Sequence, residues 1–197
     1  QSEKLALWFM KSVKKQTETG MQLAFKNVGY KMKRQTPEDV VKAITYENIE
    51  LIKSIPEKYF IGIKEIALLS LMYGWSKEKL KSEIEKRDGI VLRRVKNIAS
   101  DQTHKTTELI KRGICENNNI WVARWKYTFL SEQPRENHIQ MDGMLFDARK
   151  GCVEEGTGDL IFPGQRYNCK CSFNPVIVEY GDDIAKEIEK NSYYAKI

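Results

Sequence analysis

The sequence predicts an α+β protein in which a mostly helical N-terminal region precedes a small α+β module with a short antiparallel sheet. Three observations support this fold class. Apolar residues recur at three- and four-residue spacings as far as Arg112, which is typical of amphipathic helices. An alternating aromatic segment occupies 121–129, and short apolar runs separated by glycines follow it. We therefore assign residues 1–88 to a helical, basic region and residues 89–197 to the α+β module.

The helical region begins with an amphipathic segment over residues 3–33. Its apolar side chains return every three, four or seven residues with Lys and Glu between them, and Gly20 is expected to bend or interrupt the helix. A second helix is expected from Thr36 and Pro37, because threonine is a favourable N-cap and proline suits the first helical position. This helix is expected to end near Ser54.

Proline and glycine divide the helices that follow. Pro56 opens a segment that is apolar nearly all round, which predicts a helix at the centre of the core, and Gly74 ends it. Ser76 is expected to cap the next helix, which the pair Asp88-Gly89 should break. The last helix of this series is predicted over residues 90–112.

The clearest strand covers residues 121–129. Ala123 and Trp125 lie with other aromatic residues on one side, and charged or polar residues occupy the other. This aromatic face needs a covering layer. Further strands are predicted at 144–146, 159–162 and 173–180, with Pro175 at an edge or bulge, and a terminal helix at 182–190.

Composition limits the classes of protein to which the chain can belong. With 197 residues and 41% hydrophobic content, it can bury a core, so disorder is not expected. No apolar run approaches the roughly 20 residues of a membrane span, and the start lacks a signal-peptide pattern. We therefore expect synthesis in the cytoplasm and no membrane partner. Because the chain begins with Gln1 rather than Met, we expect it to be a piece of a longer protein.

Positive charge is concentrated in the first half of the chain. Residues 1–100 hold 20 Lys and Arg against 12 Asp and Glu, a balance of +8, whereas residues 101–197 hold 13 against 15, a balance of −2. A basic face attracts phosphate backbones or an acidic protein, and the attraction weakens with salt. The same lysines also suit an ordinary solvated helix face, so both interpretations stay open.

The scarce reactive side chains gather late in the chain. His138 is one of two histidines, and Cys152, Cys169 and Cys171 are three of the four cysteines. Without a secretory signal, a disulfide framework is not expected. Because zinc accepts thiolates and imidazole in a tetrahedral shell, these four residues form a candidate structural zinc site.

The spacing of the last two cysteines leaves a second interpretation open. Along a straight strand, residues two apart have alpha carbons roughly 6 to 7 Å apart, so a joint metal site requires a turn at Lys170. Alternatively, His138 hydrogen-bonds a backbone group or Asp142, and the cysteines are small buried hydrophobic residues.

Five short motifs follow one another over residues 90–178, about half the chain. They are Ile98-Ala99-Ser100-Asp101-Gln102 in a helix, Trp125-Lys126-Tyr127-Thr128 in a strand, Pro134-Arg135 and His138 before Asp142-Gly143, Phe162-Pro163-Gly164, and Asn168-Cys169-Lys170-Cys171. Together they resemble the C-terminal module of the phage Mu F-like head-morphogenesis proteins. On this resemblance, Trp125, Arg135, Asp142, Gly143 and Pro163 are structural motif positions.

The resemblance implies a minor head protein of a tailed phage or prophage. Such a protein would reside in the virion, in the capsid interior or at the portal vertex. Its partners would be the portal and capsid proteins, and it would act in capsid assembly and in the packaging or ejection of DNA. Contact with double-stranded DNA would be non-sequence-specific.

The resemblance also bears on the metal. Many relatives carry Cys-x-x-Cys where this chain has Arg135 and His138, so one cysteine ligand is lost here and another is exchanged for imidazole. From the chemistry alone, Cys152 is a candidate replacement ligand.

An enzyme is the competing class. In a toxin-like or nuclease effector that uses the same module, His138 would act as general base and Arg135, with Arg166, as a phosphate clamp. The sequence has no nucleophile elbow, no phosphate-cradling glycine loop and no paired carboxylate motif. We therefore expect no catalytic residues and a role in binding and positioning.

Overall fold

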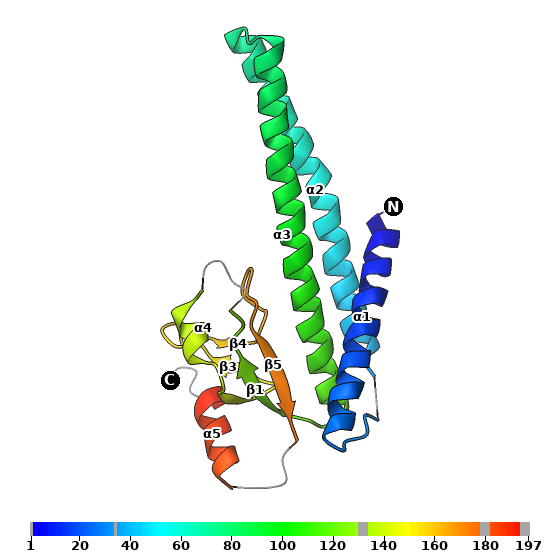
Figure 1. Cartoon of the computed structure of the whole chain (residues 1–197), viewed down its shortest axis with the longest axis vertical. Helices are drawn as coiled ribbons and strands as arrows, with labels where there is room; N and C mark the ends of the chain where they lie inside the picture. The colour runs from blue at the N-terminus through cyan, green and yellow to red at the C-terminus, as the bar shows by residue number, and fades with distance from the viewer. Residues whose placement is uncertain (1, 34, 130–133, 178–181, 194–197) are drawn as a thin grey trace.

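Three long helices form the largest part of the molecule, and a small sheet lies beside one end of them (Figure 1). The computed structural model describes residues 2–33, 35–129, 134–177 and 182–193. The helices are α1 (Ser2–Asn27), α2 (Glu38–Tyr73) and α3 (Lys77–Asn117). The predicted α+β class is confirmed. None of the described helices is both long and apolar enough to cross a membrane.

The turn between α1 and α2 differs from the prediction. Helix α1 runs straight past Gly20 and ends at Asn27, because Gly29 adopts a left-handed backbone with φ 74° and the Tyr30 amide bonds back to the Phe25 carbonyl at 2.8 Å. Thr36 does not cap α2. Its hydroxyl instead donates to Glu18 on α1 at 2.7 Å, so this threonine joins the two helices.

Helices α2 and α3 form a long antiparallel hairpin. Its turn is as predicted, because Gly74 ends α2 with φ 59° and the Ser76 hydroxyl accepts from the Lys79 amide at 3.2 Å. The predicted helix boundaries at Pro56 and at Asp88-Gly89 are wrong, because α2 and α3 continue through them. A proline inside a helix costs about 3 kcal/mol, and the packing of each long helix along the other outweighs this local preference.

The predicted domain boundary between residues 88 and 89 does not coincide with the end of a helix. Helix α3 crosses from residue 88 to residue 89 without interruption, and its C-terminal half contacts both the other helices and the sheet. The division into residues 1–88 and 89–197 stays a prediction.

The prediction that the apolar segment after Pro56 is central to the core is wrong. This part of α2 lies in the half of the hairpin that extends beyond α1 and the sheet (Figure 1). Leu71 is 82% exposed and Met72 is 73% exposed, although both belong to the apolar segment. The core lies instead at the other end of the hairpin, where α1, α2, α3 and the sheet meet.

The sheet has the strand order β2-β1-β5, with neighbours antiparallel. Strand β1 (Val122–Lys126) is central, between β2 (Leu145–Asp147) and β5 (Ser172–Val176). A second pair joins β3 (Cys152–Val153) to β4 (Leu160–Ile161). The strands predicted at 121–129, 159–162 and 173–180 are present in shorter form, and the strand predicted at 144–146 is shifted by one residue. Strand β3 was not predicted. Residues 178–180 of the last prediction lie outside the described residues.

Helices cover both faces of the three-stranded sheet. Ala123 and Trp125 are fully buried in the core shared with the long helices, as the predicted aromatic face required. Val122 packs on the other face against Ile188 of α5 (Asp182–Tyr193). Pro175 lies in the edge strand β5, as expected. The sheet therefore stands fixed beside α3, with the loops after β1 and before β5 close together.

Candidate metal centre

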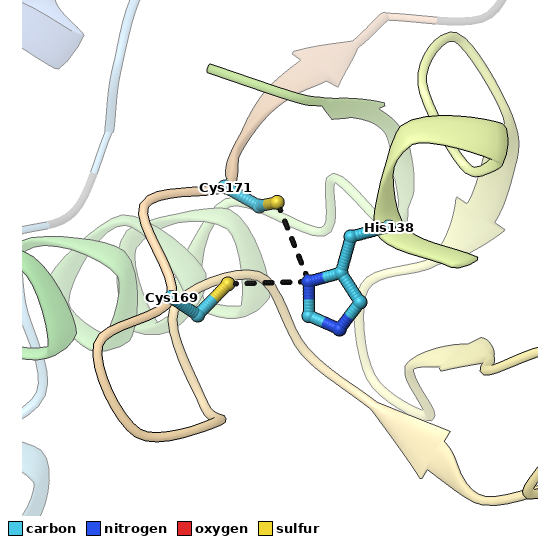
Figure 2. Close-up of side chains that lie close together, drawn as sticks. All are labelled: His138, Cys169 and Cys171. Atoms are coloured by element: carbon cyan, nitrogen blue, oxygen red, sulfur yellow. Dashed lines mark hydrogen bonds between the residues drawn. The ribbon is translucent and has the colours of Figure 1, made fainter. Parts of the chain in front are cut away.

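Three of the predicted metal ligands meet in one buried cluster. His138 projects from the short helix α4 (Glu136–Gln140), and Cys169 and Cys171 lie in the loop that leads into β5 (Figure 2). Both thiols lie 3.5 Å from His138 Nδ1. The three ligand atoms lie within 4.8 Å of one another, and each residue is only 2% exposed. This group could hold a metal ion.

The loop before β5 solves the spacing problem that the Cys-x-Cys motif posed. Asn168 adopts a left-handed backbone with φ 53°, and its amide donates to the Asp101 carboxylate at 2.7 Å. Farther on, His104 Nε2 donates to the Cys171 carbonyl at 2.6 Å. Two side chains of α3 therefore hold the loop out of the strand conformation, so both thiols point to the same imidazole (Figure 2).

A buried carboxylate lies behind the imidazole. Glu154 is 3% exposed, and its Oε1 lies 3.1 Å from His138 Nε2. Arg166 binds the other oxygen of Glu154 and also Asp159, at 2.9 Å. Metal-binding histidines commonly donate their second ring N–H to a carboxylate in this way, which fixes the tautomer and leaves the other nitrogen for the metal. The donor set therefore suits zinc.

The contacts also set the charge of the cluster. The pKa of Cys169 is lowered to about 4, chiefly because its thiolate accepts a hydrogen bond from the Cys171 thiol. Burial opposes this shift, and the hydrogen bond with His138 supports it. The pKa of Cys171 is raised, because its thiol hydrogen-bonds to Cys169 and is buried. Burial alone would lower the pKa of His138, but Cys169 and Glu154 raise it overall. A thiolate is the form of cysteine that binds metals, and the lowered pKa of Cys169 favours this form.

Glu154 itself stays ionised in the interior. Burial would raise the pKa of Glu154, but hydrogen bonds from Arg166, His138 and Thr157 lower it overall. Nothing in the sequence distinguishes Glu154, because one glutamate among many before a glycine turn gives no pattern. The nuclease alternative would place Arg166 in a phosphate clamp, whereas in the structure this arginine is paired with two acids.

Cys152 is not part of the cluster. It lies in β3 opposite Ile161 of β4, fully buried. Burial raises the pKa of Cys152 to about 12, and the same cause raises the pKa of Cys115 on α3 to about 12. These two cysteines therefore behave as small hydrophobic residues of the core. Of the four predicted ligands, the structure brings together three.

The structural motif residues surround the cluster. Arg135 donates to the Tyr167 carbonyl at 3.0 Å, which ties the start of α4 to the loop that carries the cysteines. Asp142 accepts from the Tyr127 amide at 2.8 Å, and Gly143 follows it with φ 85° in the turn before β2. Arg135 therefore holds the loop through a carbonyl, and Asp142-Gly143 forms a turn.

Pro163 and Trp125 complete the surroundings. Gly164, after Pro163, lies so close to α3 that an added Cβ would be 3.2 Å from His104. The indole of Trp125 meets the His138 ring edge to face, with centroids 5.6 Å apart. The loop that carries Pro163 and Gly164 therefore packs on α3, and the Trp125 ring packs on the imidazole.

Both ring nitrogens of His138 are engaged, one by the thiols and one by Glu154. In this arrangement neither nitrogen is free to act as the general base that the nuclease alternative requires. Arg135 is likewise bound to a carbonyl rather than directed to an open phosphate site. The geometry favours a ligand role for His138.

Comparison with known proteins gives one family and one relative. The family model described as phage Mu protein F like protein matches residues 62–174, from the outer part of α2 to β5. An uncharacterized protein of Haemophilus influenzae is 29% identical over 152 residues, which is 77% of this chain. The chain spans about a third of that relative's length, 32%. No solved structure gives a significant match.

Proposed function

This chain belongs to the phage Mu protein F-like family, and from this membership we propose that it acts as a minor head protein in capsid assembly at the portal of a phage or prophage. The observation that carries the proposal is the extent of the family match, which runs from the outer part of α2 at residue 62 through the whole metal cluster and into β5 at residue 174. The bacterial origin of the relative agrees with a prophage gene. The proposed role is binding and positioning, inside the capsid or at the portal vertex.

We further propose that His138, Cys169 and Cys171 hold one structural zinc ion. The fit rests on two thiols and one imidazole nitrogen that already converge, with Glu154 behind the imidazole. A cavity of about 10 Å³ adjoins the cluster, and Thr128 is among the residues that line it. This volume is near the lower limit for one water molecule. Zinc held by these three side chains would join α4 to the loop before β5.

The assembly role is tested by co-expression with the portal protein encoded in the same phage or prophage. We expect the chain to co-purify with the portal oligomer, and crosslinking in assembled particles to give peptides that join the two proteins. A variant with Cys169→Ser serves as a control for the integrity of the module, because the substitution lies in the cluster and outside the helical hairpin. If the chain stays separate from its cognate portal in both assays, the assembly proposal is wrong.

Binding to double-stranded DNA would use the basic half of the chain. On α3, Arg93, Arg94 and Lys96 are exposed. We expect sequence-independent binding that weakens by roughly 10³-fold or more between 50 and 200 mM salt if about six phosphates are contacted. Replacing these three residues with glutamine should weaken the binding and lower the salt dependence, as measured by fluorescence anisotropy.

The matched control for the DNA experiment is Lys186→Gln with Lys190→Gln in α5, where two exposed lysines lie in the less basic half. This control should bind DNA as the wild type does. Binding to one sequence alone, or binding that does not change with salt, would show that the basic half has another role.

A further inference from the structure

An apolar stripe lies uncovered on the outer half of α2. It consists of Phe60, Ile61, Leu68, Leu71 and Met72, whose exposed fractions are 67%, 52%, 50%, 82% and 73%. We call these five residues the distal stripe. They recur at spacings of three, four and seven, so they lie along one side of the helix.

The distal stripe faces away from α3. The inner side of α2 is marked by Gly62, which is buried under the guanidinium of Arg87, and Arg87 Nη2 donates to the Lys58 carbonyl at 3.2 Å. Leu68 is six residues beyond Gly62, which places it about 120° around the helix from that inner side, where it is half exposed. Figure 1 shows that neither α1 nor the sheet reaches this part of the hairpin.

The exposure of this stripe is unfavourable for an isolated chain. Burial of a Leu, Ile, Met or Phe side chain is favourable relative to exposure, because apolar surface is removed from water. A helix that is apolar on all sides is normally buried on all sides. The inner side of α2 has α3 as its partner, and within the described residues the outer side has none.

The charges on the outer side indicate which partner fits. Lys64 and Glu65 are adjacent, exposed and of opposite sign, and they interrupt the distal stripe near its middle. Glu57 is also exposed on this side, seven residues before Lys64. A surface that carries both signs of charge within an apolar stripe is complementary to itself when two copies meet antiparallel across a two-fold axis.

We propose that the distal stripe is the interface of a homodimer, in which the α2 helices of two copies pack antiparallel and Lys64 of each copy lies against Glu65 of the other. The apolar residues on either side of this charge pair form the buried contact. The proposal stands apart from the assembly role, because it concerns two copies of this chain without a portal.

Analytical ultracentrifugation over a range of protein concentrations tests the dimer. The wild-type chain is expected to dimerise, and Leu68→Glu is expected to be monomeric with an unchanged circular dichroism spectrum. Val28→Glu is the matched control, because Val28 is 67% exposed but lies outside α2, and it should dimerise as the wild type does. A wild-type chain that stays monomeric at every concentration, or a dimer that survives Leu68→Glu, overturns the proposal.

A charge exchange tests the pairing itself. Lys64→Glu places two like charges against Glu65 of the second copy, and Glu65→Lys does the same with the opposite sign. Each single variant should therefore dimerise about tenfold more weakly than the wild type. The double variant, and an equimolar mixture of the two single variants, should recover the wild-type affinity. If the mixture stays as weak as its components, the antiparallel arrangement is wrong.

Discussion

Cys169→Ser is expected to make the stability of the protein indifferent to zinc. In the wild type, a zinc ion would join His138 to Cys169, two residues that are 31 positions apart in the sequence. Cross-links that close loops of this size stabilise proteins by about 2–4 kcal/mol, largely by restricting the unfolded chain. Removing zinc with a chelator should therefore lower the free energy of unfolding of the wild type by about this amount, as measured by urea denaturation.

Cys152→Ser is the matched control for this experiment. Like Cys169, Cys152 is a buried cysteine, so both serine variants carry the cost of a buried hydroxyl. Only Cys169 belongs to the cluster. The Cys152→Ser variant should still lose stability when zinc is removed, whereas Cys169→Ser should not. A Cys169→Ser variant that responds to the chelator as the wild type does would exclude this cysteine as a ligand.

Trp125→Ala is expected to cause the largest loss of stability from a single core position. The Trp125 side chain is fully buried, and its ring centroid lies 6.0 Å from that of Phe146. It also packs against His138. Truncation of a buried aromatic residue costs about 3–5 kcal/mol, because apolar contact is lost and a cavity remains. Urea denaturation of the zinc-free protein isolates this packing term from the metal.

Trp121→Ala is the control for the same chemical change. Trp121 is 40% exposed and lies just before β1, with the guanidinium of Arg149 over its ring. Its loss should cost clearly less than that of Trp125. Equal losses for the two tryptophans would mean that the aromatic face of β1 is not the centre of the packing that supports the cluster.

The elements that the sequence predicted best are those whose signals act locally. Gly74 and Ser76 define the hairpin turn through backbone conformation and capping, which depend on few neighbours. The alternation around Trp125 likewise reports a strand with one buried face. By contrast, Pro56 and Gly89 lie within helices, because packing between α2 and α3 outweighs the preference of single residues.

The candidate site was predicted in part for the same reason. Scarcity and chemistry identified His138, Cys169 and Cys171, but they also selected Cys152, whose place depends on the pairing of β3 with β4. Glu154 reaches His138 only because the chain folds back through the loop after β3. Such contacts between distant residues are set by tertiary structure, so the spacing of residues along the chain does not predict them.

The apolar residues of the outer part of α2 have different surroundings on the two sides of the helix. An all-round apolar helix predicts burial, but on the side toward α3 Ile63 and Ile66 are only half-buried. The opposite side is exposed in the single chain, so the pattern anticipates a contact that a second molecule must complete. The family match begins at residue 62, so it includes most of this part of α2 as well as the metal cluster.

The zinc content of the purified protein tests the proposed metal centre most directly. Elemental analysis of untagged protein, purified with zinc under reducing conditions, should give one zinc per chain for the wild type and for Cys152→Ser. His138→Ala and Cys169→Ser should contain essentially none. A wild-type protein without zinc would contradict the metal centre. Loss of zinc in Cys152→Ser would show that Cys152 is a ligand, although it lies outside the cluster in the structure.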